Sequence, residues 1–114
     1  MDLGDNSATY INVDDALKRV GGNKGLFIKL LGRFVDGNHM EALESAVSGG
    51  DAEEASKLAH TLKGVSSNLS LVKVASLSAD FEHELKSGGD YMAILNALKA
   101  AYEATIEKIA EISG

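Results

Sequence analysis

Apolar residues recur at three- and four-residue steps along most of this chain, which is the spacing of one face of an α-helix. The widest such face follows Asn23, a suitable N-cap, and its members are Leu26, Phe27, Leu30, Leu31, Phe34 and Val35. The same spacing continues from residue 39 to 48 with Met40, Leu43 and Val47. Because Gly37-Asn38 between these segments can either bend a helix or end it, the pattern leaves open whether this is one helix or two.

A shorter amphipathic helix is predicted in residues 11–22. Asn12 is its N-cap, acidic residues follow it, and basic residues come just before Gly21-Gly22, which ends it. Residues 1–10 are polar and aperiodic, so we expect a flexible tail there. The folded domain is therefore expected to span residues 11–114.

Three more helices are predicted in the second half of the chain. The first begins at Asp51, which forms a capping box with Glu54, and runs to about Asn68. Ser70 is expected to cap the next helix and Asp90 the last one. Proline is absent and strand-type alternation is not found, and both observations favour uninterrupted helices. The predicted fold is all-α, an antiparallel up-and-down four-helix bundle with a short additional N-terminal helix.

Composition and net charge limit the classes of protein to which this chain can belong. A chain of 114 residues has room for one domain. The net charge of −6 repels nucleic-acid phosphates on average, so we expect a protein partner and no nucleic acid. The absence of cysteine excludes disulfides, thiolate metal sites and cysteine nucleophiles. The sequence contains no apolar run near ~18 residues and no signal-peptide pattern. We therefore expect a cytoplasmic monomer that does not contact a membrane.

His60 lies on the side of the Asp51 to Asn68 helix that faces away from the apolar stripe. The stripe consists of Ala55, Leu58, Ala59, Leu62, Val65 and Leu69. The helical neighbours of His60 are polar or small residues, namely Ser56, Lys63, Gly64 and Ser67. Taken alone, an exposed histidine among such residues is most simply an ordinary solvent-facing strip.

The same strip also suits phosphoryl chemistry. A histidine that accepts a phosphoryl group must be exposed, because its attacking nitrogen has to approach a phosphorus atom on another molecule. Gly64 leaves space for the incoming group one turn away, although a glycine inside a helix costs ~1 kcal/mol relative to alanine. Lys63 places an ammonium group near the negative phosphoryl oxygens, and Ser67 extends the small, hydrogen-bonding strip.

Four stretches of the sequence carry a further pattern. They are AHTLKG at residues 59–64, VSSNLS directly after it, LSADFE at residues 77–82, and INVDDALKRVGGNKGLFIKLLGRFV upstream, which has Phe34 near the middle of its second helix. Together they resemble the histidine-containing phosphotransfer (HPt) domain of multistep phosphorelays. The resemblance covers nearly all of the chain from about Ile11 onward.

The resemblance implies that His60 accepts a phosphoryl group from an aspartyl phosphate on a receiver domain and relays it to another receiver in two-component signalling. It implies a charge-stabilising role for Lys63 and a space-leaving role for Gly64. The expected partners are receiver domains of response regulators or hybrid sensor kinases, which would dock on helix faces beside the histidine, including exposed apolar residues of the Phe27 to Leu31 helix. No cofactor is expected on this chain, since Mg²⁺ is expected only on the partner receiver. The chain departs from the family at Ser70, where glycine is usual, and we expect an altered turn there with no loss of transfer.

Other functions were weighed against this one. The alternative is a phosphorylation-independent module that only binds receivers, and the presence of His60 with Lys63 and Gly64 speaks against it. A metal- or haem-binding bundle needs inward-facing histidines or glutamates on several helices, and the predicted core faces contain none. The paired glycines form no P-loop, so we expect a phosphoryl carrier that is neither an autonomous enzyme nor a kinase.

The two other histidines are expected to have no chemical role. His39 follows the Gly37-Asn38 break and is interpreted as a loop or helix-end residue. His83 comes three residues after Asp80 and matches one copy of the carboxylate-x-x-His element of di-metal bundles, but a surface histidine among acids is the simpler interpretation. Neither is expected to act together with His60.

Overall fold

The computed structural model describes residues 10–113, which are helical apart from short turns. The helices are α2 (Val13–Arg19), α3 (Lys24–Asp36), α4 (His39–Ser48), α5 (Ala52–Asn68), α6 (Val72–Ser87) and α7 (Tyr91–Ser113). No strand occurs in this part of the chain, and the all-α prediction is confirmed. Of the expected N-terminal tail, residues 1–9 lie outside the described residues, while Tyr10 packs against the core.

The chain breaks between α3 and α4. Gly37 is the C-cap that follows α3, and Asn38 takes the left-handed conformation with a φ of 49°. Asparagine adopts this conformation more readily than most residues. The sequence left a bend and a break equally open, and the structure shows a break.

Side-chain caps begin the helices at most of the predicted positions. Asn12 and Asn23 accept hydrogen bonds from the backbone N–H groups three residues on, at 3.1 and 3.0 Å. Asp51 accepts one from the N–H of Glu54 at 3.0 Å, and Asp90 accepts one from Ala93 at 3.2 Å. The backbone N–H of Asp51 donates to the carbonyl of Ala46. That bond ties the start of α5 to the end of α4.

Ser70 does not cap α6, contrary to the sequence prediction. The N-cap is Leu71, and no side chain caps this helix. Ser70 instead takes the left-handed conformation with a φ of 56°, and its hydroxyl donates to the carboxylate of Asp15 on α2. The backbone N–H of Asn12 also donates to the Ser70 carbonyl, at 2.9 Å. The turn between α5 and α6 therefore holds the short helix α2.

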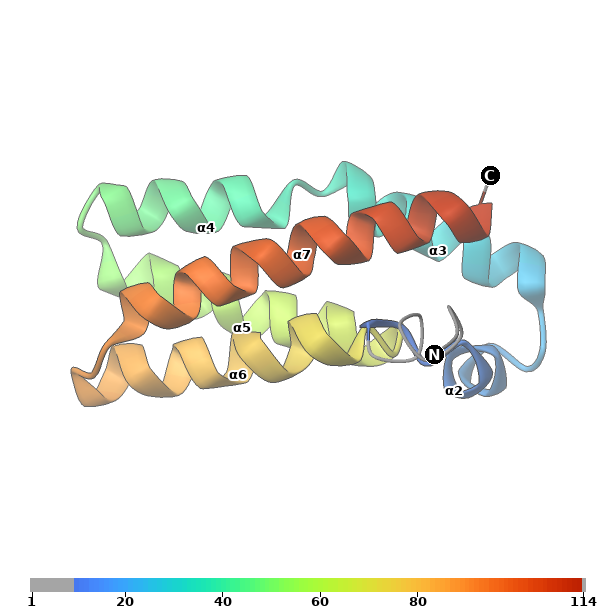
Figure 1. Cartoon of the computed structure of the whole chain (residues 1–114), viewed down its shortest axis with the longest axis horizontal. Helices are drawn as coiled ribbons and strands as arrows, with labels where there is room; N and C mark the ends of the chain where they lie inside the picture. The colour runs from blue at the N-terminus through green and yellow to red at the C-terminus, as the bar shows by residue number, and fades with distance from the viewer. Residues whose placement is uncertain (1–9, 114) are drawn as a thin grey trace.

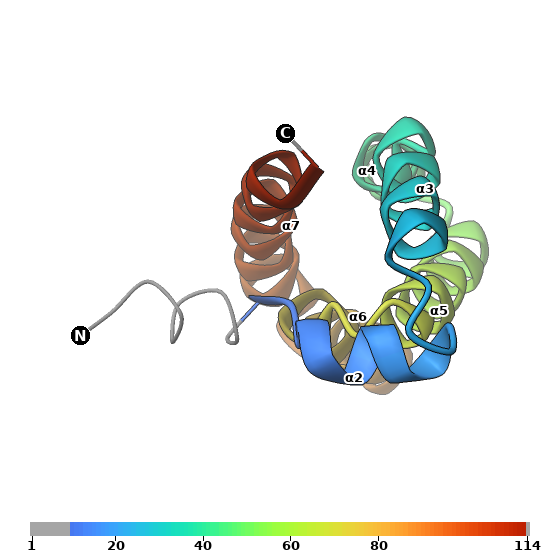
Figure 2. The ribbon, with the colours of Figure 1, turned by 90° about the vertical axis from the view of Figure 1, so that its right-hand side faces the viewer.

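The long helices lie side by side along the molecule (Figure 1). The most extensive packing is between α5 and α6, followed by α6 with α7 and α4 with α5, whereas α3 and α7 touch over a smaller area. Figure 2, which looks along the helices, shows α5 and α6 at the base of a U whose arms are α7 and the pair α3 and α4. In the same view α2 crosses the end of α5 and α6.

The core is filled from every helix. Its largest fully buried side chains include the three phenylalanines and six aliphatic residues: Phe27, Phe34, Phe81, Ile11, Leu31, Leu43, Leu62, Leu71 and Leu98. Burial of a leucine or phenylalanine side chain stabilises a fold by roughly 1.5–3 kcal/mol, so this core fixes which face of α5 points outward. Among the described residues, no helix combines the length and the apolar character needed to cross a membrane.

Candidate functional site

His60 stands on the outward face of α5, as the sequence predicted. Its side chain is 67% exposed, and Gly64 and Ser67 are exposed on the same face. Its immediate neighbours toward the core, Ala59 and Leu62, are fully buried. The imidazole is thus held by a rigid helix while its ring is open to solvent.

Glu82 on α6 is the closest charged neighbour of this imidazole. One carboxylate oxygen, Oε1, lies 3.5 Å from His60 Nδ1 and 4.0 Å from Lys63 Nζ. The other, Oε2, accepts a hydrogen bond from Lys86 Nζ at 3.2 Å. The side chain of Glu82 is only 14% exposed. A single, largely buried carboxylate therefore faces His60 and two lysine ammonium groups.

These contacts set the charge of Glu82. Burial alone would raise its pKa, but the hydrogen bonds and positive charges of Lys86 and His60 outweigh that effect, so the pKa of this carboxyl lies below its ordinary value. Glu82 is consequently an anion at neutral pH. Its Oε1 can accept a hydrogen bond from the Nδ1–H group of His60.

The position of Glu82 also selects the tautomer of His60. An anion beside Nδ1 favours the form in which Nδ1 carries the hydrogen. The lone pair is then on Nε2, the nitrogen farther from Glu82. The nucleophilic nitrogen of this tautomer is therefore Nε2.

The surroundings of His60 form a shallow hollow between α5 and α6. Its volume is about 370 Å³, and its lining residues are His60, Lys63, Ala79, Glu82, His83 and Lys86. Ser67 is on the exposed face of α5 but does not line the hollow. A Cβ atom placed on Gly64 meets no other atom within 4 Å, so the fold leaves open space beside this glycine.

The hollow contains residues that the sequence analysis did not connect with His60. His83 was expected to have no link to the site, yet it lines the same hollow. Glu82 and Lys86 were not singled out as site residues either. All three lie on α6, and only the packing of α6 on α5 brings them to the histidine. The one available signal was their shared face, since residues three or four apart line up on a helix.

His39 lies elsewhere, at the first position of α4, as expected of a helix-end residue. Its ring packs against Phe34, with the centroids 5.2 Å apart. Within residues 10–113, no three histidine, cysteine, aspartate or glutamate side chains gather in a way that could hold a metal ion.

Comparison with known families gives a match to the Hpt domain over residues 34–108. Comparison with curated proteins and with solved structures yields no match. The matched segment spans well over half of the chain and contains α4, α5 and α6 entire, with His60 and the whole hollow around it. The chain therefore belongs to the Hpt domain family, which gives it a phosphotransfer role in two-component phosphorelays and receiver domains as its class of partner.

Proposed function

We propose that His60 accepts a phosphoryl group from an aspartyl phosphate on one receiver domain and passes it to an aspartate on another. The observation that carries the proposal is the exposed side chain of His60 with the Glu82 carboxylate 3.5 Å from Nδ1, which favours the tautomer whose lone pair is on Nε2. We infer that Nε2 is the phosphorylated nitrogen. The long helices, taken as an antiparallel up-and-down four-helix bundle in which α3 and α4 form one interrupted rod, present this nitrogen to a docked partner.

The transfer exchanges one bond to phosphorus for another. Nε2 attacks the phosphorus atom, the bond between phosphorus and the aspartyl oxygen breaks, and the receiver's carboxylate leaves with that electron pair. The imidazole ring gains positive charge as the new N–P bond forms. The Glu82 carboxylate, 3.5 Å from Nδ1, is placed to stabilise that charge while the proton stays on Nδ1. The second transfer reverses these steps with a new carboxylate as the nucleophile.

The remaining residues of the site contact the phosphoryl oxygens or leave room for the phosphoryl group to approach His60. Lys63 carries an ammonium group that can pair with a phosphoryl oxygen, one turn from His60. Gly64 leaves the approach open, and Ser67 continues a narrow polar surface along α5. The divalent cation that phosphoryl transfer from an aspartate requires is assigned to the receiver, so this chain supplies the nucleophile and its charge environment.

The decisive experiment uses a phosphorylated receiver and three forms of this protein. After incubation, the wild type should carry phosphate that is labile in acid and stable in base, as expected of a phosphohistidine. The His60→Gln variant should carry none. The matched control is His83→Gln, which removes the other imidazole of the same hollow and should still become phosphorylated. Phosphate on the His60 variant, or loss of phosphate only in the His83 variant, would contradict the assignment.

The same experiment separates this function from receiver binding without phosphorylation. A pure binding module would perturb the NMR spectrum of a receiver and bind it equally well as wild type and as His60→Gln, yet take up no phosphate. Uptake by the wild type, with none by His60→Gln, excludes that alternative.

A further inference from the structure

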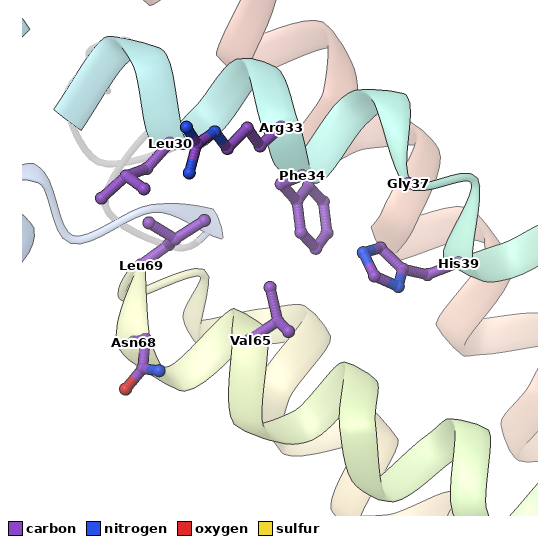
Figure 3. A pocket seen from close by; sticks show the side chains of 8 residues that line it. All are labelled: Leu30, Arg33, Phe34, Gly37, His39, Val65, Asn68 and Leu69. Carbon is purple, nitrogen blue, oxygen red and sulfur yellow. The ribbon is translucent and has the colours of Figure 1, made fainter. Parts of the chain in front are cut away.

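A second cavity lies on the other side of α5, between this helix and α3 (Figure 3). Its volume is about 400 Å³, and it shares no lining residue with the hollow around His60. Most of its wall is apolar and consists of Leu30, Phe34, Val65 and Leu69. Figure 3 shows Leu30 and Phe34 of α3 pointing toward Leu69 and Val65 across it.

The break between α3 and α4 shapes one end of this cavity. The His39 ring packs on Phe34 there and comes so close to Gly37 that a Cβ on Gly37 would lie 2.6 Å from His39 Nε2. Only glycine leaves the ring in this position. The ring of His39 therefore forms the end wall, and a side chain at position 37 would displace it.

Polar groups reach the cavity at a few points only. Arg33 runs along its α3 edge toward Leu30, and Asn68 stands at the α5 edge (Figure 3). Burial lowers the pKa of His39, so its imidazole is mainly neutral at pH 7. The positive charge of the cavity thus comes from the guanidinium of Arg33.

Arg33 has no carboxylate of its own within the described chain. No aspartate or glutamate of residues 10–113 forms an ion pair with it within 4.0 Å, and it is the one lysine or arginine among the described residues that line the cavity. The protein as a whole carries a net charge of −6. An open guanidinium beside an apolar recess is therefore a local feature that suits an anion with an apolar body.

We propose that this cavity is a binding site for a small monocarboxylate whose body is an aliphatic chain or an aromatic ring. The carboxylate pairs with Arg33, which can donate two parallel hydrogen bonds to it. The apolar body lies between Phe34 and Val65. The volume falls within the roughly 300–1,000 Å³ of small-molecule sites, which are mostly apolar with a few placed polar groups. One guanidinium matches one carboxylate better than it matches a polyanion.

The test is an NMR titration of the unphosphorylated protein with sodium octanoate as the probe. Octanoate should shift the backbone amide signals of α3 and of the C-terminal end of α5, from Val65 to Leu69, in a saturable way. Octanol has the same chain length without the charge and should bind about five- to tenfold more weakly, because it lacks the charge-assisted hydrogen bonds. Arg33→Gln should weaken octanoate binding by a similar factor and leave octanol unchanged.

The matched control is Lys24→Gln on the same helix. Lys24 is exposed and does not line the cavity, so its loss removes the same charge without touching the site. Octanoate affinity in this variant should equal that of the wild type. Shifts that grow linearly with concentration, equal binding of octanoate and octanol, or equal losses in both variants would overturn the proposal.

The outcome is independent of phosphotransfer. No receiver is present in the titration, so a protein that fails to become phosphorylated can still bind octanoate. If a receiver shifts the signals of the cavity residues and octanoate does not, the cavity belongs to the receiver interface and the small-ligand proposal is wrong.

Discussion

Glu82 is the residue on which the charges around His60 converge. It faces His60, Lys63 and Lys86 at 3.5, 4.0 and 3.2 Å. A phosphoryl group on Nε2 would compete with Glu82 for the two lysines, because both are anions within reach of the same ammonium groups. Glu82 therefore holds Lys63 and Lys86 beside the histidine while the histidine is unmodified.

The lowered pKa of Glu82 predicts how the free energy of unfolding of the protein changes in acid. Since the folded-state pKa lies below the unfolded one, ionised Glu82 stabilises the fold above the unfolded pKa, and this contribution disappears as the pH falls through the folded-state pKa. Between pH 7 and pH 3, the free energy of unfolding of the wild type should fall by about 0.5–1 kcal/mol more than that of Glu82→Gln. The difference is small because the side chains that contact Glu82 are well solvated.

Urea unfolding at the two pH values measures this difference. Glu107→Gln on α7 is the matched control, because Glu107 is exposed and forms no ion pair in the described chain. It should keep the pH dependence of the wild type. Parallel losses in the wild type and in Glu82→Gln would show that the contacts of Glu82 do not stabilise the fold.

Substitution of Gly64 should have opposite effects on the stability of the fold and on the rate of phosphoryl transfer. Nothing lies within 4 Å of a Cβ placed there, and the same holds for Gly32 in α3. Alanine at either position should stabilise the protein by about 0.5–1 kcal/mol, since glycine is the weaker helix former. Only Gly64→Ala should slow phosphoryl uptake from a receiver, because only that methyl group stands one turn from His60.

Thermal unfolding and the initial rate of uptake check this pair of variants. A stabilised Gly64→Ala that accepts phosphate as fast as Gly32→Ala would remove the access role from Gly64. A destabilised Gly64→Ala would mean that the glycine serves the fold.

The limit of sequence reasoning at the residue scale is visible in this site. His60, Lys63 and Gly64 share one helix, so their common face followed from helical periodicity alone. Glu82 and His83 lie on α6, and their approach to His60 depends on how two helices are rotated and shifted against each other. That register is set by packing of buried side chains such as Ala59 and Phe81, which no local pattern encodes.

At the scale of elements, the α5–α6 turn links parts of the chain that are far apart in sequence. Ser70 is separated from Asp15 by 55 positions, yet its hydroxyl donates to that carboxylate. The hydrogen bond from Ser70, together with that from Arg19, holds the pKa of Asp15 below its usual value. The expected cap at Ser70 was wrong because the residue serves this distant contact in a left-handed backbone conformation.

Two substitutions at Ser70 distinguish the contribution of its hydroxyl group from that of its backbone conformation. Ser70→Ala loses the hydroxyl and keeps a side chain at positive φ, so it should destabilise the protein and raise the pKa of Asp15 toward its ordinary value. Ser70→Gly loses the same hydroxyl but removes a backbone penalty of about 1 kcal/mol, and should be correspondingly more stable than the alanine variant.

NMR titration of Asp15 and urea unfolding provide the two readings. An unchanged Asp15 pKa in both variants would contradict the hydrogen bond. Equal stability of the alanine and glycine variants would contradict the backbone penalty.

Helix boundaries show which elements the sequence could define. Asn12, Asn23, Asp51 and Asp90 each cap a helix as predicted, because a cap needs only an acceptor side chain and the N–H groups that follow it. The separation of α3 from α4 could not be decided, since Gly37-Asn38 permits both outcomes. The packing of His39 on Phe34 and Gly37 accompanies the break and is not encoded locally.

At the scale of the whole molecule, packing is uneven. The most extensive contacts join α5 to α6, and α2 is held mainly at the α5–α6 turn. We predict that amides in the middle of α5, around Ala59 and Leu62, exchange with solvent only through global unfolding. Amides of α2 should exchange through local opening at lower free energy.

Native-state hydrogen exchange in low urea measures the protection of the amides in α5 and in α2. The free energy for exchange in α5 should equal the free energy of global unfolding, and that of α2 should be smaller and nearly independent of urea. Equal protection of both helices would show that α2 is a full part of the cooperative core.

Both steps of the proposed relay use the same nitrogen of His60, whose side chain is exposed on the outward face of α5. Two receivers cannot occupy that face together, so the first must depart before the second arrives. The throughput of such a relay depends on how quickly each receiver dissociates as well as on the chemistry. Tighter binding to either receiver would slow signalling. Short-lived binding of each receiver is therefore favourable for rapid relay.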